Sequence, residues 1–200
     1  MNVLIISASH RNPSQSRKVA DVVSGLVKKH SGFKDIALLD LAEAGIPLWD
    51  EGVWRGEEQW MKILAPLRNQ VRKADAYIIV VPEWNGGATP SIKNFALFFG
   101  EKETGHKPVW LISVSSEING QYPVTDMRSY VYKNNKWVFI PDHTIVRFVH
   151  EKFNEESLSA EEKLLLERMQ YSLRQLELYA RAMREVRDKL KFDDRFKYAM

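Results

Sequence analysis

Short, continuous apolar runs recur along the chain, and each one ends in a polar stretch that favours a loop. These runs cover residues 2–8, 33–41, 76–81, 108–114 and 143–149. A strand that is apolar on both faces has to be covered on both faces, as in the parallel sheets of α/β proteins. The pattern therefore predicts five strands in an α/β fold.

Apolar residues at spacings of three and four predict helices between these strands. The first helix carries such residues between positions 19 and 27, directly after a polar loop. Further helices are predicted over residues 57–73, 91–99 and 122–133. Pro66 lies inside the first of these three, and proline removes a backbone donor from a helix. We therefore expect a break or a new helix start at Pro66.

One long helix is predicted over residues 159–190. Its apolar positions alternate at spacings of four and three, with Ser172 as a polar position in the series: Leu165, Met169, Leu176, Tyr179, Met183, Val186 and Leu190. A helix of about 30 residues spans ~45 Å, which is longer than strands of about five residues can cover. We expect its first half to cover the sheet and its second half to contact a neighbouring subunit.

Composition narrows the class of protein. The 200 residues fit one domain, expected over residues 1–200. The net charge of +3 is mild, and basic residues alternate with acidic ones, so a nucleic-acid partner is not expected. The absence of cysteine excludes disulfides, thiol nucleophiles and Cys-ligated metals. No apolar run reaches the ~18 residues of a membrane helix and no signal peptide is visible, so a cytoplasmic location without a membrane partner is expected.

The loop after the first strand has the composition of an anion site. Ser9, Arg11, Ser14 and Ser16 lie between that strand and the first helix. A helix N-terminus offers free N–H groups and a positive dipole end, which suit a phosphate. The alternative is that a serine is an ordinary helix N-cap and Arg11 a solvated side chain. The loop has neither a Gly-x-Gly-x-x-Gly nor a Gly-Lys-Ser motif, so a dinucleotide turn or a P-loop is not supported.

Two more loops end strands at the same edge of the expected sheet. Residues 83–89 include Asn85-Gly86-Gly87, and residues 115–120 begin with two serines. Ligands of open α/β sheets bind outside the carboxyl ends of the strands, so these three loops together predict a ligand site. His143 and His150 bracket the fifth strand without a second ligand at metal spacing. We expect both to be structural or surface residues, and no metal site.

Two of these loops also resemble a known family. The segments Ser9-His10-Arg11-Asn12-Pro13-Ser14-Gln15-Ser16 and Pro82-Glu83-Trp84-Asn85-Gly86-Gly87 are similar to motifs of the NADPH-dependent FMN reductases, which are flavodoxin-like proteins. That family typically shows Gly-Ser-x-Arg-x-x-Ser-x-Ser and Pro-Glu-Tyr-Asn-Gly-Ser at these places. The resemblance covers roughly residues 2–150. It implies a three-layer sandwich with a five-stranded parallel sheet in the order 2-1-3-4-5 and helices on both faces.

The resemblance also assigns roles to residues of the three loops. The phosphate of FMN would be held by Ser9, Arg11, Ser14, Gln15 and Ser16. The isoalloxazine ring would be bordered, largely through backbone groups, by Pro82, Glu83, Trp84, Asn85 and Gly86. Two residues would lie under the other edge of the ring: Ser115 and Ser116.

This chain departs from the family pattern at three places. Ala8 stands where glycine is usual, and Trp84 replaces tyrosine. The third loop has fewer glycines than the family usually shows and contains Glu117. A carboxylate near the ring would repel an electron-rich flavin or a nicotinamide phosphate, and so would alter the choice of substrate.

The implied activity is that of an FMN-dependent oxidoreductase. A hydride would pass from NADPH or NADH to bound FMN and then to a small-molecule acceptor such as a flavin, quinone, azo compound or metal oxyanion. Because the cofactor carries this chemistry, no catalytic side chain is required. Trp49, Trp54 and Trp84 would form an apolar rim that suits flat acceptors. A homodimer or homotetramer is expected.

Two alternatives remain open at this point. One is an electron carrier like flavodoxin, with FMN but without nicotinamide activity. Flavodoxins are strongly acidic and have a different phosphate loop, whereas this chain has a net charge of +3. The other is a flavin-free binding module on the same fold, because a fold does not determine a function.

Overall fold

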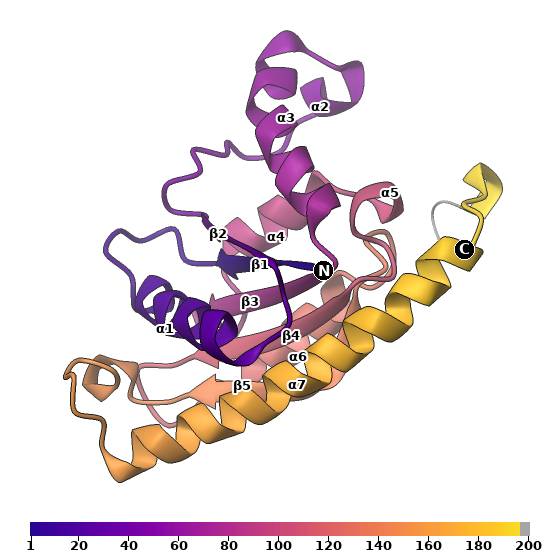
Figure 1. The fold of residues 1–200 in the computed structure, drawn as a ribbon. Helices are drawn as coiled ribbons and strands as arrows, with labels where there is room; N and C mark the ends of the chain where they lie inside the picture. Colours follow the sequence, from indigo (N-terminus) through magenta and orange to yellow (C-terminus); the bar gives the residue numbers. More distant parts are fainter. Residues whose placement is uncertain (197–200) are drawn as a thin grey trace.

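The computed structural model describes residues 1–196 and contains a five-stranded parallel sheet with the order β2-β1-β3-β4-β5 (Figure 1). This order confirms the arrangement that the family resemblance implies. The strands are β1 (Asn2–Ser7), β2 (Asp35–Asp40), β3 (Ala76–Pro82), β4 (Pro108–Val114) and β5 (Val138–Val146).

Helices connect the strands and cover both faces of the sheet. The longer ones are α1 (Gln15–His30), α3 (Glu58–Lys73), α4 (Pro90–Leu97), α6 (Gln121–Tyr130) and α7 (Ala160–Lys189), and each overlaps a helix expected from the sequence. Four short elements were not anticipated: α2 (Gly52–Arg55), α5 (Glu101–Thr104) and the 3-10 turns η1 (Val149–Glu151) and η2 (Asp194–Phe196).

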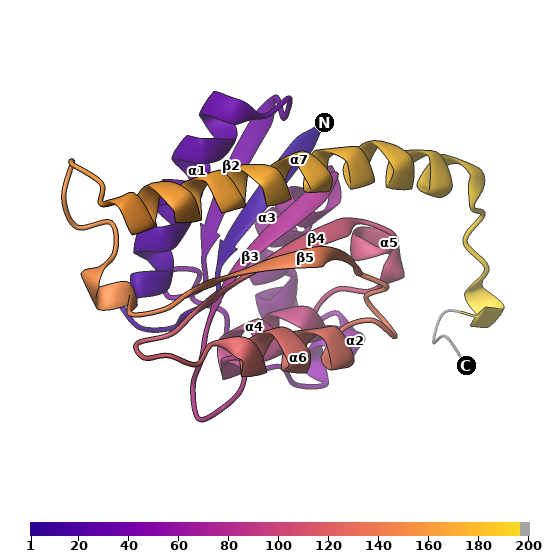
Figure 2. The same cartoon turned by 90° about the horizontal axis from the view of Figure 1, so that it is seen from below.

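The strand β3 shows how the three layers are held together. All seven of its residues are buried, and successive side chains point to opposite faces. Tyr77 and Ile79 join a cluster with residues of α3, α4 and α6. Ile78 and Val80 join the other cluster, with residues of α1 and α7. Figure 2 shows α1 and α7 on one side of the sheet and α4 and α6 on the other.

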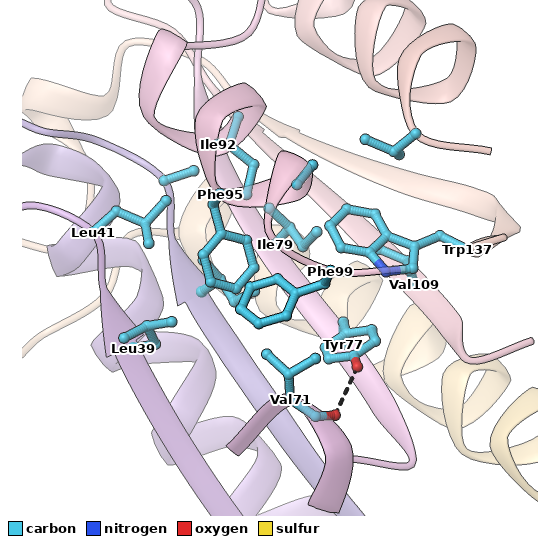
Figure 3. Packing of buried hydrophobic residues seen from close by; sticks show 14 of the residues in the cluster. Leu39, Leu41, Val71, Tyr77, Ile79, Ile92, Phe95, Phe99, Val109 and Trp137 are labelled. Atoms are coloured by element: carbon cyan, nitrogen blue, oxygen red, sulfur yellow. Dashed lines mark hydrogen bonds between the residues drawn. The ribbon is translucent and has the colours of Figure 1, made fainter. Parts of the chain in front are cut away.

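A polar anchor completes the cluster under α3 (Figure 3). The Tyr77 hydroxyl donates to the carbonyl of Val71 at 2.8 Å. Lys107 Nζ donates to the same carbonyl at 2.8 Å and to that of Arg72 at 3.0 Å. These carbonyls belong to the last turn of α3, where no backbone N–H group of the helix is left to donate to them. Burial lowers the pKa of Lys107 to about 7, and the nearby positive charge of Arg187 adds to the effect.

The helix α3 corrects the expectation of a break at Pro66. It runs without interruption from Glu58 to Lys73 with Pro66 inside it. Pro66 lies on the exposed side, whereas Leu64 and Leu67 are buried. The hydrogen bond that proline removes therefore leaves a carbonyl that water can reach, and the helix continues.

The strand β5 begins and ends earlier than predicted. It covers Val138–Val146, whereas the sequence favoured residues 143–149. β5 is the edge strand, only three of its nine residues are buried, and the exposed Pro141 lies within it. Proline is tolerated in an edge strand because its missing N–H faces no partner strand. Residues 147–149 instead leave the sheet and turn toward α1.

The helix α7 extends past the sheet that it covers (Figure 2). Met169, Leu173, Leu176 and Ala180 are buried against the sheet. Val186, in the last turns, is 38% exposed. The apolar residues of α7 are therefore buried against the sheet in the middle of the helix and exposed near its end. The contact with a neighbouring subunit stays a prediction. Within residues 1–196, no helix has the length and apolar character needed to cross a membrane.

Candidate functional site

A pocket open to solvent lies at the carboxyl edge of the sheet. Its cavity volume is about 70 Å³, and about 470 Å³ when the open solvent at its mouth is included. Its walls come from the ends of β3 and β4 and the residues that follow them, from the loop after β1, from η1 after β5 and from the start of α1. The lining residues are Ser9, Arg11, Pro13, Ser14, Gln15, Ser16, Pro82, Glu83, Trp84, Val114, Ser116, Val149 and His150.

The start of α1 supplies the polar floor of the pocket. Ser14 is the N-cap, and its Oγ accepts a hydrogen bond from the backbone N–H of Arg17 at 3.1 Å. The N–H groups of Gln15 and Ser16 precede the first intrahelical hydrogen bond and remain available for a ligand. Together with the positive end of the helix dipole, they make this floor favourable for an anion.

The serine hydroxyls keep their protons for a ligand. Ser9 Oγ accepts from the N–H of Arg11 at 3.1 Å, just as Ser14 Oγ accepts from Arg17. A hydroxyl that accepts one hydrogen bond can still donate its own hydrogen. Gln15 Oε1 is buried and has no partner within the described part of the chain. The exposed side chain of Arg11 adds a positive charge at the mouth.

The second loop is a closed turn. Trp84 and Gly87 exchange two backbone hydrogen bonds at 3.0 and 3.1 Å, and the two residues between them have positive φ, 48° at Asn85 and 68° at Gly86. Positive φ at both central residues is the signature of a type I′ turn, and Asn-Gly is its preferred sequence. The turn leaves Trp84 on the pocket wall, where its ring contacts that of His10 with 4.4 Å between centroids.

Side chains tie this loop to its neighbours. Asp126 of α6 accepts from the N–H of Ala88 and from Lys93 Nζ, both at 2.8 Å. On the other side, Thr89 Oγ1 and Ser91 Oγ both donate to the carbonyl of Ala8, at 2.5 and 2.7 Å. The first and second loops are therefore held side by side.

Most polar groups of the third loop are hydrogen-bonded to other residues of the protein. Glu83 Oε2 accepts from the N–H of Gly120, and Ser115 Oγ accepts from the N–H of Glu117. Arg147 donates to the carbonyls of Ile118 and Asn119. Ser116 remains directed at the pocket, whereas Glu117 is exposed and does not line it.

Most of the predicted site residues meet in this one pocket. Nine of them line it: Ser9, Arg11, Ser14, Gln15, Ser16, Pro82, Glu83, Trp84 and Ser116. Asn85 and Gly86 lie at the exposed tip of the turn, and Ser115 is buried behind the third loop. Trp49 and Trp54 contact each other, with ring centroids 4.6 Å apart, but neither lines the pocket.

Sequence reasoning missed Pro13, Val114, Val149 and His150 as lining residues. Val149 and His150 lie in η1, beyond the fifth strand. Lys18 of α1 holds this segment: its Nζ donates to the carbonyl of Val149 at 2.9 Å and to Asn154 Oδ1 at 2.8 Å. These partners are more than 130 residues apart in sequence. The one sequence signal for these residues was that His150 directly follows an apolar run.

Comparison with known proteins agrees with this geometry. Residues 1–151 match the family described as NADPH-dependent FMN reductase. The chain is 30% identical to a quinone reductase of Pseudomonas putida over 121 residues, which is 57% of this chain and 60% of that protein. It is 27% identical to an FMN-dependent NADPH-azoreductase of Staphylococcus saprophyticus over 132 residues, 66% of this chain and 69% of that one.

Solved structures share the fold at low sequence identity. FerB of Paracoccus denitrificans, a flavoenzyme NAD(P)H:(acceptor) oxidoreductase, superimposes with a TM-score of 0.69 at 15% identity, covering 91% of this chain and 98% of FerB. The chain spans 60% of the length of the quinone reductase that it matches. Because the family match takes in residues 1–151 of 200, the chain belongs to the family of NADPH-dependent FMN reductases.

Proposed function

We propose that this protein is an FMN-dependent NAD(P)H oxidoreductase that passes electrons to a small, flat acceptor. The observation that carries the proposal is a single pocket that joins a helix N-terminus rich in hydroxyl groups to apolar walls at the strand ends. The names of its relatives, a quinone reductase and an azoreductase, favour quinones and azo compounds as acceptors. Free flavin and metal oxyanions belong to the same set of candidates.

The polar end of the pocket fits the phosphate and ribityl chain of FMN. The hydroxyl protons of Ser9 and Ser14 are free, because within residues 1–196 each Oγ acts only as an acceptor. The unpaired Oε1 of Gln15 needs a donor, and a ribityl hydroxyl group is one. In this proposal the phosphate end is held by Ser9, Arg11, Ser14, Gln15 and Ser16.

The other end of the pocket fits a flat ring. Pro82, Trp84 and Val114 supply apolar wall area, and Glu83 turns its carboxylate away toward Gly120. The two hydrogen bonds of the turn use Trp84 and Gly87, so the N–H groups of Asn85 and Gly86 remain available at the rim. The proposed ring contacts are Pro82, Glu83, Trp84, Asn85 and Gly86, with Ser115 and Ser116 on the side of the third loop.

FMN, when bound, supplies the redox chemistry by taking electrons from NADPH or NADH and giving them to the acceptor. The residues of the chain bind and orient it. The dipole of α1 and Arg11 fix the phosphate end, and the closed turn at Trp84–Gly87 presents a rigid edge. Because the cofactor would carry the chemistry and the residues would only bind it, the pocket needs no nucleophile.

The test begins with uptake of FMN by the purified protein, followed by anaerobic addition of NADPH or NADH. Bleaching of the flavin absorbance is expected. A yellow protein that neither nicotinamide bleaches would instead be an electron carrier, and a protein that takes up no FMN would be a flavin-free module. Arg11→Ala is expected to raise the dissociation constant of FMN by roughly 5- to 150-fold, the equivalent of about 1–3 kcal/mol. Arg184→Ala, at an exposed position of α7, is the matched control.

We also propose that α7 contacts a second copy of this chain, through an exposed stripe on both halves of the helix and not through its second half alone. Leu164, Tyr171 and Leu178 are more than half exposed and follow one another at intervals of seven residues. Residues seven apart lie on the same side of a helix, as in the seam between paired helices. A second copy of α7 presents the same stripe, as a two-fold symmetric interface requires.

A further inference from the structure

The side of the pocket formed after β4 and β5 has a small set of polar groups. Its lining residues are Val114, Ser116, Val149 and His150, and the first and third of these are apolar. Ser115 is buried behind this side and does not line the pocket; its N–H donates to the carbonyl of Val146, its carbonyl accepts from Val149 and its Oγ accepts from Glu117. Ser116 and His150 are therefore the polar side chains that this side presents to a ligand.

These two side chains form a pair. Ser116 Oγ and His150 Nε2 are 3.3 Å apart. If Nε2 carries the hydrogen, it donates to Oγ and the serine proton is free to donate into the pocket. If the serine donates to Nε2, then Nδ1 carries the hydrogen and can donate instead. In both tautomers the pair keeps one hydrogen for a ligand.

The backbone around His150 is fixed from several sides. Asn154 Nδ2 donates to the carbonyl of His150 at 2.7 Å, and Lys18 holds both Asn154 and the carbonyl of Val149. The N–H of Val149 donates to the carbonyl of Ser115 at 3.1 Å. The helix α1, whose N-terminus forms the polar floor, thus also positions the segment that carries His150.

We propose that Ser116 and His150 act as one hydrogen-bond donor unit toward the electron-rich edge of the bound cofactor, with Lys18 and Asn154 as positioning residues. The inference rests on the proposed function. Reduced FMN carries more negative charge on its ring than oxidised FMN does, and a donor at that edge favours the reduced form. The pair would therefore bind reduced FMN more tightly than oxidised FMN and raise the reduction potential.

The experiment measures the dissociation constant of oxidised FMN and the midpoint potential of the FMN-loaded protein. The variants are Ser116→Ala, His150→Ala and the double variant. In each single variant, the dissociation constant of reduced FMN divided by that of oxidised FMN is expected to rise about tenfold. This is the effect expected when one hydrogen bond to a charged group is lost. A tenfold change corresponds to a fall of about 30 mV for a two-electron couple. The double variant is expected to match the singles, because the two residues act as a unit.

Three further variants sharpen the result. His150→Gln keeps a donor and is expected to recover part of the potential. Asn154→Ala removes the anchor of the His150 backbone, and a smaller fall in the same direction is expected. His30→Ala replaces an exposed histidine at the opposite end of α1 from the pocket and is expected to leave the potential unchanged.

The outcomes separate this inference from the function on which it rests. Wild-type protein that takes up FMN and is bleached by a nicotinamide, combined with unchanged potentials in both single variants, overturns this inference alone. Weaker binding of oxidised FMN at an unchanged potential also overturns it, because the pair would then contact the tail of the cofactor. A wild-type protein that takes up no FMN overturns the proposed function and this inference together.

Discussion

The carboxylate of Glu83, at the end of β3, accepts a hydrogen bond from the backbone N–H of Gly120, at the start of α6. The contact joins the second and third loops of the pocket across 37 residues of sequence. Gly120 has φ 106°, and a Cβ there would lie 2.4 Å from Ile145 Cγ2, so glycine is required. Glu83 therefore serves first as a tie between two loops.

Glu83→Ala is expected to lower the free energy of unfolding by about 1–2 kcal/mol, because it leaves the Gly120 N–H without its charged acceptor. Glu83→Gln keeps an acceptor and is expected to cost less than half as much. Urea denaturation followed by fluorescence measures both. Glu117→Ala, at an exposed position of the same loop, is the control and should lie within ~0.5 kcal/mol of the wild type. Equal losses in all three variants would contradict this role.

Lys107 is expected to make the stability depend on pH above neutrality. Burial lowers its pKa from 10.5 to about 7, so between these values the unfolded chain binds a proton that the folded chain does not. Stability rises with pH wherever the unfolded state binds more protons. The contribution of Lys107 therefore increases the free energy of unfolding from pH 7 toward pH 10.5, by at most about 1.4 kcal/mol per pH unit.

Lys107→Met should remove this slope. Urea unfolding at pH 7, 8 and 9 is expected to show a smaller gain in stability for the variant than for the wild type. The variant also loses the hydrogen bonds to the carbonyls of Val71 and Arg72, but that loss lowers the unfolding free energy at every pH and does not change its slope with pH. Lys73→Met, an exposed lysine in the last turn of α3, provides the comparison and should keep the wild-type slope.

Glu162 is expected to stabilise the fold in the opposite pH range. Its carboxylate accepts from the backbone N–H of Phe153 and of Ser159, and these bonds lower its pKa from 4.5 to about 2. A lowered carboxylate pKa gives stability that is present above pH 4.5 and is lost as the pH falls toward 2.

Comparison of wild type with Glu162→Gln tests this. The difference in unfolding free energy between the two proteins should shrink from pH 5 to pH 3, because over that range the unfolded wild-type chain takes up a proton at Glu162 that the folded chain does not. Glu156→Gln, an exposed residue of the preceding loop, should show a constant difference. A difference between wild type and Glu162→Gln that stays constant with pH would show that the charge of Glu162 does not matter.

The stripe on α7 gives a prediction about assembly. Sedimentation velocity at micromolar concentration is expected to show a dimer or tetramer. Leu178→Glu combined with Tyr171→Glu should yield monomers, because both side chains are more than half exposed in the single chain and would be buried only between copies. Leu97→Glu, at a residue of α4 that is 55% exposed, should leave the assembly intact. A monomeric wild type would refute the proposal.

The sequence was most informative about the centre of the sheet. β1, β3 and β4 are buried along nearly their whole length, so their apolar runs have no gaps and their ends are visible. β5 lies at the edge and is half-buried, so its bounds were predicted wrongly. Pro66 was misjudged because the sequence does not reveal which side of α3 faces water.

The pocket was predictable to the extent that it is local. Each of the first three loops follows a buried strand, so their residues could be assigned to one edge from strand order alone. His150 could not be found in this way. Its place depends on contacts of Lys18 with Val149 and Asn154, which no local pattern encodes. For the same reason the tryptophans at 49 and 54 were expected at the pocket and lie elsewhere.

Arg187, near the end of α7, pairs with Asp75 at 3.0 Å and donates to the carbonyl of His106 at 3.0 Å. Asp75 precedes β3 and His106 precedes β4, so the contacts of Arg187 lie where those strands begin. The pocket lies where the strands end. The two ends are separated by the seven residues of β4, roughly 23 Å at 3.3 Å per residue. Phe192, just beyond α7, lines the same hollow as Arg187 and His106, so a surface tether or fluorescent label attached beside it would leave the mouth of the pocket unobstructed.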